Sequence, residues 1–180
     1  MAMRRMFFVA AILTVAGTAS ADTYLGLGLG TTPTVSDEFS SATTATPVGR
    51  SARGLAGMRF GNVSIEAAVN GYGVALPTFG SRTVYQGSVQ AKLSVPIGNN
   101  FEGFGRGGVE RTWLDLGDTR YDYTGDGYVL GAGLELRLNA ILANASLFLD
   151  YTYHRTTLAS ETQQFEASAG MWGLGLTVGI

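Results

Sequence analysis

The residue in this sequence that could most readily do chemistry is His154, its only histidine. Thr156 offers a hydroxyl two residues later, and Glu166 offers a carboxylate further along the chain. Histidine, hydroxyl and carboxylate are the three groups of a hydrolytic triad. An imidazole near the loop end of a strand is more commonly an ordinary polar group. We therefore expect no catalytic residues and keep His154, Thr156 and Glu166 as the alternative.

Two other groups contain residue types that are common in ligand-binding sites, but their spacing does not match a known site. Four aspartates lie in one polar stretch, at Asp115, Asp118, Asp122 and Asp126. They do not have the oxygen-ligand spacing of an EF-hand loop. The alternating glycines at 26–30 do not open a helix, so they form no dinucleotide fingerprint. The sequence therefore predicts no metal site and no cofactor.

Nine charged residues share a strand face with glycines and polar residues. They are Arg59, Glu66, Lys92, Glu102, Arg106, Glu110, Glu135, Arg137 and Asp150. The signs are nearly balanced, which fits a network of ion pairs. A small polar pore lined by the same residues is the second interpretation. Which one applies depends on the strands that position these side chains.

The segments that must position these residues have the two-residue periodicity of β-strands. Apolar and polar residues alternate in eight segments, at 25–30, 53–60, 63–70, 85–95, 101–113, 128–138, 141–154 and 171–180. Short turns are predicted at 61–62, 96–100 and 139–140, and long loops at 31–50, 71–81, 114–126 and 155–164. An even-stranded meander with this asymmetry closes into an antiparallel up-and-down barrel. Because eight strands leave room only for packed side chains, we favour the ion-pair network over the pore.

In the segments at 128–138, 141–154 and 171–180, the opposite face is apolar and carries no interrupting charge. Its clearest members are Leu130, Leu134, Leu136, Leu147, Leu149, Trp172, Leu174, Leu176, Val178 and Ile180. A charged residue facing lipid near the bilayer midplane costs about 2–4 kcal/mol for Arg or Lys. A water-soluble barrel would place polar residues outside and apolar residues inside. We therefore predict an all-β, eight-stranded transmembrane barrel whose apolar face contacts lipid.

Aromatic residues are expected in two belts, one at each membrane surface. The loop end would carry Tyr85, Trp113, Tyr128, Tyr151, Tyr153 and Trp172, and the turn end Phe60 and Phe101. Ordinary core packing of aromatics is the alternative, but it does not predict two belts.

The first 21 residues have the three parts of a secretory signal. Arg4 and Arg5 precede an apolar core at 6–16, and Ala19 to Ala21 form a small-residue cleavage site. We expect residues 1–21 to be removed and residues 22–180 to form the barrel domain. Without Arg4 and Arg5, 10 of the 12 basic residues remain against 14 acidic residues, the wrong balance for a nucleic-acid partner.

These features resemble the OmpA/OmpX-like small outer-membrane barrel proteins of Gram-negative bacteria, of the porin family. The resemblance rests on the signal, the eight-strand layout, the hairpin at 57–67, the strand segment at 104–109 and the alternating C-terminal strand. It implies location in the bacterial outer membrane and contact with its lipids and lipopolysaccharide. It also implies that the barrel-assembly machinery reads the C-terminal strand. Family members usually end in Phe or Trp, whereas this chain ends in Ile180.

Three functions of different class are compatible with this resemblance. We expect a monomeric structural or surface-interaction barrel whose outer loops contact lipopolysaccharide or external partners. A lipid A acyl hydrolase is one alternative, although the pattern of such enzymes has Ser two residues after His, where this chain has Thr156. A narrow low-conductance channel is the other.

Overall fold

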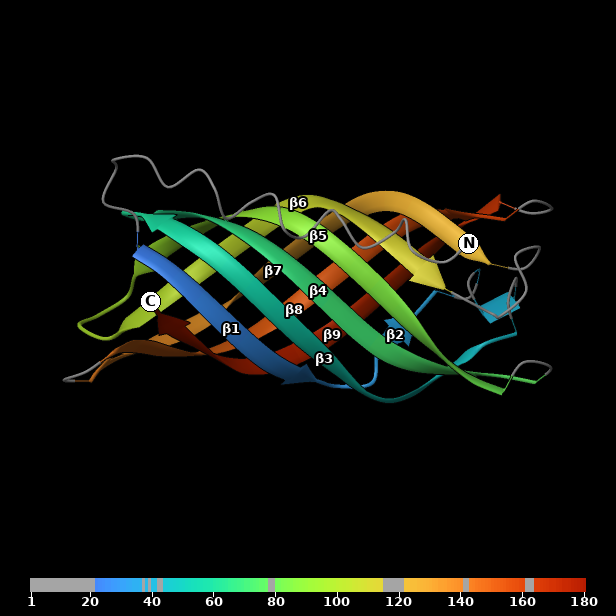
Figure 1. The fold of residues 1–180 in the computed structure, drawn as a ribbon, viewed down its shortest axis with the longest axis horizontal. Helices are drawn as coiled ribbons and strands as arrows, with labels where there is room; N and C mark the ends of the chain where they lie inside the picture. Colours follow the sequence, from blue (N-terminus) through green and yellow to red (C-terminus); the bar gives the residue numbers. More distant parts are fainter. Residues whose placement is uncertain are drawn as a thin grey trace.

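The computed structural model describes residues 22–36, 38, 40–41, 44–77, 80–114, 122–140, 143–160 and 164–180. These residues form one antiparallel sheet that curls into a barrel (Figure 1). Its strands are β1 (Asp22–Gly30), β2 (Thr34–Val35), β3 (Thr46–Phe60), β4 (Val63–Leu76), β5 (Gly80–Pro96), β6 (Phe101–Leu114), β7 (Tyr123–Ala140), β8 (Ala143–Ala159) and β9 (Gln164–Gly179). Among the described residues, no helix has the length and apolarity required to span a membrane.

The barrel closes because the first long strand pairs with the last. Strands β3 to β9 follow one another around the wall, and β1 pairs with both β3 and β9. The two-residue strand β2 also pairs with β9, so it continues the line of β1 after a break at 31–33. The ring therefore has eight positions. This arrangement confirms the predicted eight-stranded antiparallel up-and-down barrel.

Tight turns join the strands at one end of the barrel, which we call the turn end. Phe60 pairs with Val63 around the predicted Gly61–Asn62 turn. Gly61 has a φ of 63°, a conformation that glycine adopts without a steric penalty and that two-residue hairpins require. The C-terminus lies at this end in Figure 1. The turn predicted at 139–140 was wrong, because both residues lie in β7 and Ala140 pairs with Ala143.

The four long loops at the opposite end, the loop end, were predicted too long. Strand β3 already begins at Thr46, and β4 and β5 occupy almost all of 71–81. Strand β7 begins at Tyr123 and β8 runs to Ala159. Of the four aspartates, Asp126 lies in a strand, and Asp115 and Asp118 lie outside the described residues.

The strands were underestimated because their polarity inverts towards the loop end. In β8, Leu149 faces outward and Asp150 inward, but further along Arg155 is exposed and Leu158 is buried. The inward residues of the loop end form the upper apolar cluster, which consists of Ala45, Tyr72, Val74, Leu76, Val84, Leu114, Tyr123, Leu158, Ala169 and Met171. A strand predicted from one continuous apolar face therefore ends where this inversion begins.

Candidate functional site: the barrel interior and its outer face

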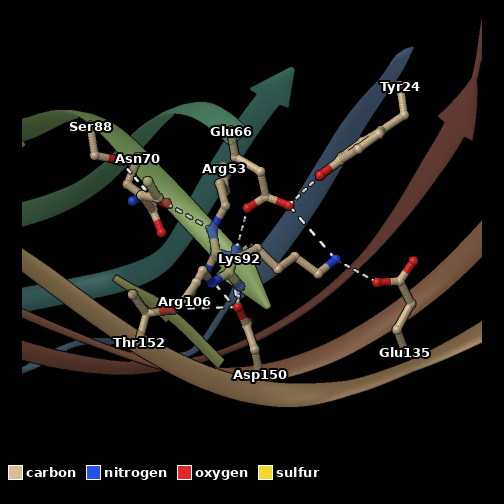
Figure 2. A network of polar contacts seen from close by, with 11 residues as sticks. Tyr24, Arg53, Glu66, Asn70, Ser88, Lys92, Arg106, Glu135, Asp150 and Thr152 are labelled. Atoms are coloured by element: carbon tan, nitrogen blue, oxygen red, sulfur yellow. Dashed lines mark hydrogen bonds and ion pairs between the residues drawn. The ribbon is translucent and has the colours of Figure 1, made fainter. Parts of the chain in front are cut away.

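The centre of the interior is an ion-pair network built around Asp150, whose side chain is 0 % exposed (Figure 2). Arg53 on β3 donates from Nη1 to Asp150 Oδ2 at 2.8 Å, and Arg106 on β6 also pairs with this carboxylate. Thr152 and Asn70 accept the other donors of Arg53, at 3.0 Å each. One carboxylate therefore compensates two guanidinium groups from opposite parts of the wall.

Glu66 on β4 is the second junction of the network. It accepts from Arg106 at 3.3 Å and from the Tyr24 hydroxyl at 2.7 Å, and its Oε1 lies 3.7 Å from Lys92 Nζ. Lys92 in turn donates to Glu135 Oε2 at 2.5 Å. Figure 2 shows these side chains pointing towards one another from separate strands. The centre of the barrel is thus cross-linked by charge-assisted contacts.

A smaller group of charges lies nearer the turn end. Arg59 donates from Nη2 to both oxygens of Glu102, at 3.1 and 2.9 Å. Arg137 Nη2 lies 2.7 Å from Glu102 Oε1 and is partly exposed. Eight of the nine predicted charged residues therefore join ion pairs with one another or with Arg53.

The ninth, Glu110, pairs with His154 towards the loop end. His154 Nδ1 lies 2.5 Å from Glu110 Oε2, and the Thr156 hydroxyl donates to Glu110 Oε1 at 2.8 Å. His154 is buried inside the barrel, and β8 continues past it to Ala159, so the loop predicted to begin at 155 begins later. The hydroxyl binds the carboxylate and not the imidazole, which is not the order of a triad.

The third residue of the alternative catalytic set lies on the other side of the wall. Glu166 is exposed on the outer face and pairs with Arg155. Because the backbone of β8 and β9 separates it from the interior, Glu166 cannot act on His154. The geometry therefore gives no support to a hydrolytic site formed by His154, Thr156 and Glu166.

Three residues of the interior site, Arg53, Tyr24 and Gly173, were not predicted from the sequence. Arg53 has the same parity as Arg59 on one strand, and this signal was available. With Arg53 included, the described interior has five basic and five acidic residues in contact with one another or with His154. Tyr24 precedes the alternating glycines of β1 and gave no polar signal. Gly173 also belongs to the site, because a Cβ there would lie 2.6 Å from Asp150 Oδ1.

Two small cavities lie in the described interior of the barrel. One cavity lies beside Arg53 and Asn70 and another beside His154, each with a volume of about 10 Å³. A volume of this size holds about one water molecule. At this volume, neither of the two cavities is a continuous passage through the barrel. In the part of the chain that the structure describes, no three His, Cys, Asp or Glu side chains are grouped to hold a metal ion.

The residues predicted to face lipid lie on the outer surface. Eight of them are exposed: Leu130, Leu134, Leu147, Leu149, Trp172, Leu174, Leu176 and Ile180. Leu136 and Val178 are half-buried. Aromatics lie on the same surface, including Tyr85, Tyr128, Tyr151, Phe60 and Phe101, and the rings of Tyr151 and Trp172 lie 5.3 Å apart. We call this surface the outer apolar band.

Comparisons with known proteins agree with this architecture. Residues 6–179 match the family described as outer membrane protein beta-barrel domain. The structure is similar to Neisserial surface protein A (NspA), with a TM-score of 0.63 and 17% identity over 88% of this chain and 97% of that one. It is also similar to Ail, the attachment invasion locus protein of Yersinia pestis, with a TM-score of 0.51 and 13% identity over 90% of this chain and 100% of that one. A second Ail structure, in complex with the heparin analogue sucrose octasulfate, gives a TM-score of 0.52 and 14% identity over the same shares of the two chains.

A search of curated proteins found no match. The family match covers nearly the whole chain, and the solved structures share its small closed barrel. The chain therefore belongs to the outer membrane protein beta-barrel domain family and is a β-barrel protein of the bacterial outer membrane.

Proposed function

We propose that this protein is a closed structural barrel whose outer rim binds the phosphate groups of lipopolysaccharide. The observation that carries the proposal is the presence of two exposed arginine–carboxylate pairs on the outer face of the barrel, towards the loop end. Arg155 pairs with Glu166 on neighbouring strands, and Arg111 Nη1 lies 3.6 Å from Asp126 Oδ1. Arg155 also makes a hydrogen bond with Tyr128.

The height of the outer apolar band supports this placement of the rim. Strand β8 contributes outward residues from Ala145 to Tyr153, and Arg155 is the next outward residue. Ten residue steps at about 3.3 Å, tilted by about 40°, span roughly 25 Å along the barrel axis, which equals the apolar height of outer-membrane barrels. We therefore place Arg155 at the level of the lipid headgroups.

Phosphate is a suitable partner for these arginines. Exposed ion pairs are worth only about 0–1 kcal/mol, so the carboxylates can be replaced as partners at little cost. A phosphate offers several charged oxygens that match the planar donors of a guanidinium group. The Ail structure with sucrose octasulfate is an example of a barrel of this fold with a polyanionic ligand.

The test compares two double variants with opposite expectations. Arg111→Gln with Arg155→Gln removes the donors and is expected to weaken lipopolysaccharide binding about 10- to 30-fold, at roughly 1 kcal/mol for each arginine. Asp126→Asn with Glu166→Gln keeps the arginines and removes their competitors, so binding is expected to be retained or strengthened. Native mass spectrometry of protein titrated with purified lipopolysaccharide measures both. Equal binding by all three proteins, or loss only in the carboxylate variant, would contradict the proposal.

The proposal also covers oligomeric state, catalysis, export and assembly. We propose a monomer without catalytic activity, because the interior side chains pair with one another and His154 lacks a nucleophile. Residues 1–21, which lie outside the described residues, would be removed on export and leave 22–180 as the barrel. Strand β9, with Trp172 and Leu174 exposed, would be read by the barrel-assembly machinery and is supported in that role by its unbroken apolar alternation.

A further inference from the structure

The small cavity beside His154 lies between two chemically different layers of the interior. On one side are the polar residues Gln86, Thr112 and Thr156, and on the other are Val84 and Leu158 of the upper apolar cluster. The cavity is therefore the place where the ion-paired part of the interior ends. A polar atom that faces the cavity needs a hydrogen-bond partner within the cavity, because the residues beyond it are apolar.

Two residues that line this cavity each have a buried polar atom with no hydrogen-bond partner among the described residues. The atoms are Gln86 Oε1 and His154 Nε2, and their residues are 3 % and 1 % exposed. A buried polar group without a partner destabilises the folded state, because it has lost its hydrogen bonds to water. About nine-tenths or more of such groups are satisfied in folded proteins. Two orphan atoms on one cavity therefore indicate a shared ligand.

The two threonines of the lining are engaged elsewhere. The Thr156 hydroxyl donates to Glu110, and Thr112 Oγ1 lies 3.1 Å from Thr156 Oγ1. A metal ion is also a poor match, since one imidazole and one amide oxygen fall short of the four ligands that zinc usually takes. The available volume of about 10 Å³ fits one water molecule.

We propose that this cavity binds one structural water, which bridges His154 Nε2 and Gln86 Oε1. His154 Nδ1 lies 2.5 Å from Glu110 Oε2, which leaves Nε2 as the ring nitrogen without a partner on a residue that lines the cavity. If that nitrogen is unprotonated, the water donates one hydrogen to it and the other to Gln86. If it carries a proton, the water accepts from it and still donates to Gln86. The site is therefore complete in either protonation state.

The bridge would join three strands across the interior. Glu110 lies on β6, His154 on β8 and Gln86 on β5, so the carboxylate, imidazole, water and amide form one chain of hydrogen bonds. Chains of this kind stabilise a single arrangement of buried polar groups. The water would thus close the polar interior below the upper apolar cluster.

The single histidine makes a selective test possible. Protein with isotope-labelled histidine, reconstituted in lipid nanodiscs, gives NMR signals from the ring of His154 alone. The carbon-bound ring protons do not exchange with solvent, so a cross-relaxation peak between them and water reports a bound molecule. We expect this peak in the wild-type protein, unchanged by EDTA. A folded wild-type protein without the peak would overturn the proposal, as would a spectrum that changes when metal is removed.

Two glutamines on β5 provide the variant and its control. Gln86→Leu removes one partner of the water and is expected to abolish the peak. Gln90→Leu alters a residue on the same strand with the same exposure, 3 %, which does not line the cavity. The peak is expected to persist in this control. Its persistence in a folded Gln86→Leu protein would show that Gln86 does not hold the water and would contradict the bridge.

Discussion

Replacing Asp150 with asparagine is expected to lower the free energy of unfolding by about 3–5 kcal/mol, the usual cost of breaking a buried ion pair from one side. The carboxylate is 0 % exposed and compensates both Arg53 and Arg106. An asparagine keeps the size of the side chain but removes the charge. Arg106 would keep its pair with Glu66, whereas Arg53 would keep only its hydrogen bonds to Asn70 and Thr152. Denaturant unfolding in lipid vesicles, followed by tryptophan fluorescence, measures the change.

Asp126→Asn is the matched control, because it makes the same chemical change in an exposed pair. The Asp126 side chain is 77 % exposed and lies 3.6 Å from Arg111. Water screens this pair, so the expected loss is below about 1 kcal/mol. Similar losses in the two variants would show that the interior of the barrel is hydrated and that its ion pairs are not buried.

Replacing Leu149 with arginine is expected to cost about 2–4 kcal/mol of unfolding free energy in a bilayer. Leu149 is 47 % exposed in the middle of the outer apolar band, between Leu147 and Tyr151. An arginine there would bring a charged group to the hydrocarbon region, where no water solvates it. The same vesicle unfolding assay measures the loss.

Thr157→Arg is the control for this substitution on the same strand and the same outer face. Thr157 is exposed and lies beyond Arg155, at the level assigned to the headgroups or above them. We expect a change within about 0.5 kcal/mol, as for an ordinary surface substitution. A neutral effect of Leu149→Arg would place Leu149 in water and contradict a lipid-facing surface.

The eight-stranded barrel could be predicted from the sequence because side chains alternate regularly between the two faces of its wall. Residues such as Leu147 and Asp150, an odd number apart, must therefore lie on opposite sides. The turn at Gly61–Asn62 also follows from local chemistry, since glycine tolerates the positive φ of the turn. These features depend only on neighbouring residues in the chain.

The loop end and the partners in the interior depend on the closed structure and could not be predicted in the same way. Polarity inverts near Arg155, because strands that leave the membrane need an apolar interior and a polar exterior. Arg53 meets Asp150 across 97 positions of sequence, a contact that only the closed barrel brings about. His154 likewise gained its partner Glu110 from a strand that is not its neighbour in the wall.

The most direct test of the outer apolar band is paramagnetic relaxation of leucine methyl groups in lipid nanodiscs. Leu134, Leu149 and Leu176 are exposed on three neighbouring strands and serve as reporters. We predict that a doxyl-labelled fatty acid broadens all three methyl signals and that a water-soluble gadolinium chelate leaves them unchanged. Broadening by the chelate, with no effect of the fatty acid, would show that these leucines face water and would contradict a membrane-spanning barrel.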